Sequence, residues 1–101
     1  MIDTTIKTIR VLLIDDHRSV LWGLEKLIES QKPKMEVVGK FTSFAEASPQ
    51  LTKLAPDVVL LDLDLGSEKG IDVIPLLAPI TSAKILILTG SRDTALHDQC
   101  V

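Results

Sequence analysis

The sequence predicts an α/β fold built on a parallel sheet, and three features indicate it. Short apolar stretches alternate with amphipathic stretches along the chain, which is the pattern of strands joined by crossover helices. The apolar stretches are nearly continuous, as expected for strands covered on both faces. Three of the four expected strands lead directly into Asp, Thr or Ser residues. Because ligands bind at the carboxyl ends of such strands, the expected architecture is a doubly wound sheet with a site at that edge.

The four expected strands are short runs rich in aliphatic and β-branched residues. They are residues 9–15 (IRVLLID), 35–41 (MEVVGKF), 57–62 (DVVLLD) and 83–90 (AKILILTG). The helical stretches between and after them are residues 19–31, 43–55, 71–80 and the start of a helix at 91–101.

Three prolines bear on where these helices end or bend. Pro33 stops the first helix, because the residue before a proline is disfavoured in the helical region. Pro49 is expected to kink or shorten the second helix. Pro75 fits the first turn of the third helix if Asp72 caps that helix.

Length and composition predict one domain, residues 1–101, and limit its function classes. A net charge of −3 gives no general reason to bind nucleic acid or an anionic membrane. No apolar run approaches the roughly 20 residues of a membrane span, and the amino terminus lacks the apolar core of a secretory signal. A single cysteine cannot form an internal disulfide, which fits a reducing cytosol.

The carboxylates at the strand ends are the main functional signal. The first strand ends in Asp15 and Asp16, and Asp62 ends the third. The first two, considered alone, are most simply interpreted as helix-capping residues. Three carboxylates converging at one sheet edge would repel each other, and a divalent cation would relieve that repulsion. Oxygen ligands with room for water and a phosphoryl oxygen suit Mg²⁺ better than zinc or a calcium cage.

The two histidines give no metal-binding signal in the sequence. Neither His17 nor His97 has the ligand spacing of a transition-metal site. His17 follows the acidic pair directly and is interpreted as a residue that starts the helix.

Three motifs together resemble the receiver domain of two-component response regulators. They are LLIDDHRSVLWGLEKLIE, PDVVLLDLDLGSEKG and ILILTGS. The DDH segment followed by a GL-containing helix is most similar to the NarL/FixJ branch of that family. The resemblance runs from about Ile9 to the end of the chain and implies a flavodoxin-like sheet. In that fold the four strands present here take the order 2-1-3-4.

The resemblance also implies a role for each residue at the strand ends. Asp62 matches the aspartate that accepts a phosphoryl group. Asp16 matches the direct Mg²⁺ ligand, and Asp15 its companion, which acts through water. Asp64 occupies the position whose backbone carbonyl completes the metal site. Thr89 matches the switch hydroxyl that bonds the phosphoryl oxygen.

The resemblance implies a cytoplasmic signalling module that has no enzymatic activity beyond its own phosphorylation and dephosphorylation. Its partner would be a sensor histidine kinase, and DNA would be bound only through an output domain absent from these residues. The family's fifth strand, with its terminal lysine, and fifth helix are expected to lie outside a chain that ends at Val101. Residues 85–88 would then form an unpaired apolar edge, so a homodimer or other self-association is expected.

Two alternatives stay open on the sequence. LLDLDLG also resembles the nucleophile motif of haloacid-dehalogenase-type phosphohydrolases, although Gly66 stands where that motif has Thr or Val, and Asp15 and Asp16 would have no role there. A module that uses the receiver fold only for binding, without phosphorylation, is the other alternative. A small phosphodonor distinguishes the three by a stable acyl phosphate, turnover or no reaction.

Overall fold

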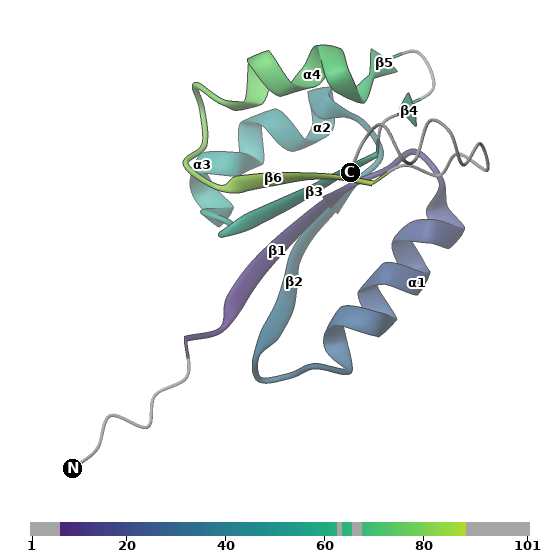
Figure 1. The fold of residues 1–101 in the computed structure, drawn as a ribbon, viewed down its shortest axis with the longest axis vertical. Coiled ribbons are helices and arrows are strands. Elements are labelled where there is room, and N and C mark those ends of the chain that lie inside the picture. The colour runs from purple at the N-terminus through teal and green to yellow at the C-terminus, as the bar shows by residue number, and fades with distance from the viewer. Residues whose placement is uncertain (1–6, 63, 66–67, 89–101) are drawn as a thin grey trace.

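A four-stranded parallel sheet forms the centre of the computed structural model, which describes residues 7–62, 64–65 and 68–88 (Figure 1). The strand order is β2-β1-β3-β6, which confirms the predicted order 2-1-3-4 of a doubly wound fold. The strands are β1 (Ile9–Ile14), β2 (Met35–Phe41), β3 (Val58–Asp62) and β6 (Lys84–Leu88).

Helices cover both faces of this sheet (Figure 1). Helix α1 (Arg18–Glu29) packs on one face. The other face is covered by α2 (Phe44–Ala47), the 3₁₀ turn η1 (Ser48–Gln50), α3 (Leu51–Leu54) and α4 (Gly70–Leu77). A short antiparallel pair, β4 (Asp64–Leu65) with β5 (Glu68–Lys69), follows β3 and was not predicted.

The predicted second helix is three short pieces in the structure, which confirms the expected effect of Pro49. The proline lies inside the 3₁₀ turn that separates α2 from α3. Ser43 caps α2 by accepting a hydrogen bond from the Glu46 backbone N–H through its side chain, and Ala55 ends α3 in the left-handed region at φ 46°. For α4, the expectation of an Asp72 cap was wrong. The helix begins at Gly70, so Asp72 lies in its first turn and Pro75 lies inside the helix.

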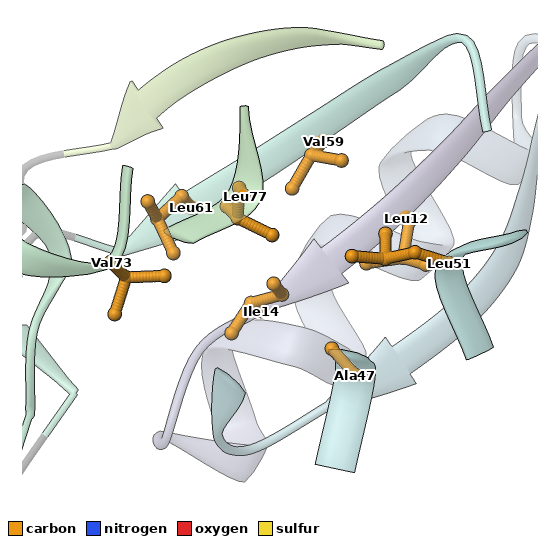
Figure 2. Packing of buried hydrophobic residues seen from close by; sticks show 8 residues of the cluster. All are labelled: Leu12, Ile14, Ala47, Leu51, Val59, Leu61, Val73 and Leu77. Atoms are coloured by element: carbon orange, nitrogen blue, oxygen red, sulfur yellow. The ribbon is translucent and has the colours of Figure 1, made fainter. Parts of the chain in front are cut away.

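Alternate residues of β1 face the two layers of the core. Val11 and Leu13 pack with Leu21 and Ile28 of α1. The larger cluster, on the opposite face, joins β1 and β3 to the three helices there (Figure 2). Its buried members are Leu12, Ile14, Ala47, Leu51, Val59, Leu61, Val73 and Leu77. Because β1 is buried on both faces, its sequence shows no polar alternation.

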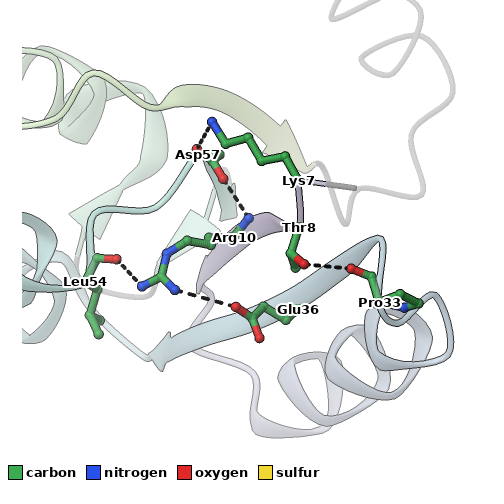
Figure 3. Close-up of polar contacts among 7 residues, drawn as sticks. All are labelled: Lys7, Thr8, Arg10, Pro33, Glu36, Leu54 and Asp57. Atoms are coloured by element: carbon green, nitrogen blue, oxygen red, sulfur yellow. Dashed lines mark hydrogen bonds and ion pairs between the residues drawn. The ribbon is translucent and has the colours of Figure 1, made fainter. Parts of the chain in front are cut away.

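Polar contacts fasten the amino-terminal end of β1 to its neighbours (Figure 3). The Arg10 backbone N–H donates to Asp57 Oδ2 at 2.9 Å, and its guanidinium donates to the Leu54 carbonyl at 2.6 Å. The guanidinium also lies 3.5 Å from Glu36 on β2, and Lys7 lies 3.7 Å from Asp57. This end of the sheet therefore pairs its acids with cations and backbone donors.

Candidate functional site

Strand register places two aspartates side by side at the carboxyl edge of the sheet. Ile14 on β1 pairs with Leu61 on β3, so the next residues along each strand are Asp15 and Asp62. The Asp15 backbone N–H donates to the Phe41 carbonyl at 2.9 Å, which extends the β1–β2 pairing by one residue. Parallel pairing of two apolar strands of matched length is thus what brings these carboxylates together.

Burial distinguishes the three carboxylates of this edge. The side chains of Asp15 and Asp62 are 6% and 7% exposed, whereas that of Asp16 is 29% exposed. One carboxylate oxygen of each, together with a ring nitrogen of His17, lies within 4.8 Å of the others. Charged groups buried in this way are costly unless paired or bound to a cation.

His17 is the residue of this site whose role the sequence did not predict. It takes the N-cap position of α1, which confirms its expected place at the helix start, but its side chain caps nothing. Instead its Nδ1 lies 2.9 Å from Asp16 Oδ1, 3.1 Å from Asp15 Oδ1 and 3.7 Å from Asp62 Oδ2. Neither aspartate of the first pair is the N-cap of α1, so the simple capping interpretation was wrong. The sequence feature that could have indicated this role is the position of His17 directly after Asp15 and Asp16.

The carboxylates raise the pKa of His17 above its ordinary value. The main cause is the hydrogen bond to Asp15, and the negative charge of Asp16 adds to it. The His17 backbone N–H also donates to Asp15 Oδ1, at 2.8 Å. The charge state of the imidazole therefore depends directly on the carboxylates around it.

A cation would satisfy an oxygen that the protein leaves without a donor. Asp16 Oδ1 is buried and accepts no hydrogen bond in the described structure, despite the nearby ring nitrogen. Buried acceptors normally have a partner, so such an atom at the centre of an acidic cluster fits a metal ligand. The donor set, three carboxylates at one point, suits Mg²⁺.

Of the other two predicted site residues, the structure gives the backbone pairing of Asp64 and does not describe Thr89. Asp64 is the first residue of β4, two positions beyond Asp62, and pairs with Lys69 of β5. Thr89 lies outside the described residues; Leu88, the last residue of β6, pairs with Asp62. The structure therefore brings together Asp15, Asp16 and Asp62, all three expected there.

Comparisons with known proteins agree with this fold. Residues 11–101 match the response regulator receiver domain family. The chain is 38% identical over 86 residues to the transcriptional regulatory protein LiaR of Bacillus subtilis, covering 84% of this chain and 40% of LiaR. It is 37% identical over 92 residues to the DNA-binding transcriptional activator DevR/DosR of Mycobacterium tuberculosis, covering 89% and 42%. A solved structure of the RcsB response regulator of Salmonella typhimurium superposes with a TM-score of 0.77 at 30% identity, covering 91% and 48%.

The chain spans about two fifths of the length of the curated relatives it matches. Within the residues that the structure describes, no helix has the length and apolar character needed to cross a bilayer. The family match covers nearly the whole sequence, and the sheet order and acidic edge are those that the resemblance implied. The chain belongs to the response regulator receiver domain family.

Proposed function

We propose that this chain is a phosphoacceptor module in a two-component phosphorelay, with Asp62 as the residue that accepts the phosphoryl group. The observation that carries the proposal is the position of Asp62: buried, at the carboxyl end of β3, with the carboxylates of Asp15 and Asp16 beside it. Membership of the receiver family supports the same assignment. We assign the site to one domain formed by residues 1–101.

In the proposed reaction, a carboxylate oxygen of Asp62 attacks the phosphorus of a phosphohistidine on a sensor kinase. The new O–P bond forms as the P–N bond breaks, and the histidine leaves with the electron pair. Asp15, Asp16, Asp62 and the backbone carbonyl of Asp64 would hold Mg²⁺. When bound, Mg²⁺ neutralises the charge of the transferring phosphoryl group. The chain's own residues orient the nucleophile, because β3 fixes Asp62 at the sheet edge.

The consequences of phosphorylation belong to the same proposal. Thr89, by its position after β6, would bond a phosphoryl oxygen and couple the site to the rest of the domain. The relatives are named as a transcriptional regulatory protein and a DNA-binding transcriptional activator, which supports a transcriptional output through a separate DNA-binding domain. We infer a cytoplasmic protein that self-associates and has no enzymatic activity beyond its own phosphorylation and dephosphorylation.

The test is phosphorylation by a small phosphodonor, such as acetyl phosphate, with Mg²⁺, read by intact mass. We expect the parent chain to gain one phosphoryl group and Asp62→Asn to gain none. Asp72→Asn is the matched control, because Asp72 is an exposed carboxylate on α4 that undergoes the same chemical change. An Asp62→Asn variant labelled as well as the parent would refute the acceptor assignment. Steady turnover of the donor would instead favour a phosphohydrolase, and no reaction a binding-only module.

A further inference from the structure

The ring of His17 is placed among the carboxylates as a fourth donor. Its Nδ1 is within 3.7 Å of one oxygen from each of Asp15, Asp16 and Asp62. The cluster of possible ligand atoms in this part of the chain therefore comprises one nitrogen and three oxygens.

The distances from His17 Nδ1 to the three oxygens are close to those between ligands around one ion. Ligands about 2.1 Å from a metal are roughly 3.0 Å apart when they meet at a right angle and about 3.4 Å apart in a tetrahedron. The distances from Nδ1 to the oxygens of Asp16, Asp15 and Asp62 are 2.9, 3.1 and 3.7 Å. All four atoms lie within 4.8 Å of one another, so an ion placed among them would draw the more widely separated atoms closer together.

The backbone fixes where His17 stands while leaving its ring accessible. The residue is the N-cap of α1, and its own N–H donates to Asp15 Oδ1 at 2.8 Å. Its side chain is 59% exposed, so solvent and ions reach the ring. In the neutral tautomer with the proton on Nε2, Nδ1 offers a lone pair toward the cluster.

We propose that His17 is a nitrogen ligand of the metal held by this acidic cluster, and that it tunes the site toward transition ions such as Co²⁺ and Zn²⁺. This inference rests on the cation site of the proposed function and adds a ligand and a metal class to it. Imidazole suits Zn²⁺ and other transition ions, whereas Mg²⁺ prefers oxygen. A site made only of Asp15, Asp16, Asp62 and a carbonyl would lack that nitrogen contribution.

Calorimetric titration of the metal-free chain with Mg²⁺ and with Co²⁺ tests the proposal. We expect Co²⁺ to bind the parent more tightly than Mg²⁺. His17→Asn should lower the Co²⁺ affinity at least about tenfold, the scale on which even indirect partners of metal ligands act. Its Mg²⁺ affinity should change much less than its Co²⁺ affinity, because Mg²⁺ prefers oxygen ligands. Asn is itself a good N-cap residue, so α1 should be retained. His97→Asn, at the only other histidine of the sequence, should bind both ions like the parent.

A spectroscopic measurement shows the bond directly. With Co²⁺ bound, an imidazole ligand should give a strongly shifted, exchangeable Nε2–H proton resonance, present in the parent and in His97→Asn and absent in His17→Asn. Equal Co²⁺-to-Mg²⁺ affinity ratios in the parent and His17→Asn, or retention of that resonance in His17→Asn, would overturn the role of His17. Mg²⁺ binding and phosphorylation would still stand in that case. If neither ion binds the parent, the cation site of the proposed function fails as well.

Discussion

Replacing Asp16 with Asn separates the two effects of a carboxylate in this cluster, repulsion without metal and coordination with it. The change removes one negative charge and keeps the shape of the side chain. A ligand oxygen of Asp16 lies within 4.8 Å of one oxygen from each of Asp15 and Asp62. Two unit charges at that distance repel by about 1 kcal/mol even with the screening of bulk water. Two such pairs give about 2 kcal/mol of repulsion that the substitution would relieve.

The loss of the Asp16 contact with His17 opposes this gain. Nδ1 of His17 is 2.9 Å from Asp16 Oδ1, and the raised pKa of the imidazole favours its charged form beside that carboxylate. We therefore expect Asp16→Asn to be between neutral and about 2 kcal/mol more stable than the parent in the absence of metal. The gain should grow at high pH, where the imidazole is neutral.

With Mg²⁺ this stability advantage of Asp16→Asn over the parent should shrink or reverse. An ion at ten times its dissociation constant stabilises the parent by about 1.4 kcal/mol, or roughly 5 to 10 °C in melting temperature for a chain of this size. Asp16→Asn should lose most of this increment. Melting curves with and without Mg²⁺ give both quantities, and Asp72→Asn, the same charge change on an exposed site, should keep the full Mg²⁺ increment. If Mg²⁺ stabilises Asp16→Asn as much as the parent, Asp16 is no ligand. A metal-free loss of more than about 1 kcal/mol would refute the repulsion argument.

Four further predictions concern the core, a helix end, the imidazole and the sheet edge. Leu12→Ala should cost about 2 to 5 kcal/mol in urea unfolding, because Leu12 is fully buried between β1 and the helices of the larger cluster; a smaller loss would mean that the cluster collapses around the cavity. Ala55→Gly should stabilise the chain by up to about 1 kcal/mol, because Ala55 has φ 46°; an unchanged urea midpoint would contradict this. NMR titration of the metal-free chain should give His17 a pKa above 6.5. Protonation of His17 therefore stabilises the fold fully at pH values below the pKa of this residue in the unfolded state, and this stabilisation is lost as the pH rises through its pKa in the folded state. A measured pKa at or below 6.5 would contradict the cluster geometry. Finally, the chain should self-associate through β6, which pairs only with β3 among the described strands and exposes 52% of Leu86. Light scattering over a dilution series should show a dimer that Leu86→Glu weakens, and a monomer at all concentrations would contradict it.

The strand ends could be predicted from sequence because their position depends on pattern alone. A buried parallel strand is a nearly continuous apolar run, so its last residue can be identified within about one position. The predicted second strand, 35–41, has the bounds of β2. Once β1 and β3 pair in parallel, Asp15 and Asp62 must lie at one edge, and no knowledge of side-chain packing is needed. The resemblance to the receiver family then supplied roles that residue types alone left open.

The features that sequence did not predict depend on local side-chain geometry. The ring of His17 could turn to solvent or to the carboxylates, and only the structure shows the second. The predicted helix 71–80 starts within one residue of Gly70, but the condition that Asp72 caps it is not met, because Asp72 lies inside the first turn and the helix follows β5 directly. Short antiparallel pairs of two residues carry too few side chains to leave a pattern.

The two ends of the sheet show why the acidic edge is best explained by function. At the amino-terminal end, Asp57 accepts a backbone N–H and lies near Lys7, and the Arg10 guanidinium contacts Glu36, so each acid has a donor or a cation. At the carboxyl end, three carboxylates surround one imidazole, and the Asp16 oxygen nearest that ring accepts no hydrogen bond in the described structure. A fold selected for stability alone would not gather carboxylates there, because their repulsion weakens it. The apolar clusters on both faces and the contacts around Arg10 hold the sheet together without the acidic edge. The repulsion at that edge is therefore tolerable, and in the function that we propose a bound cation would offset it and screen the charge of the phosphoryl group that Asp62 receives.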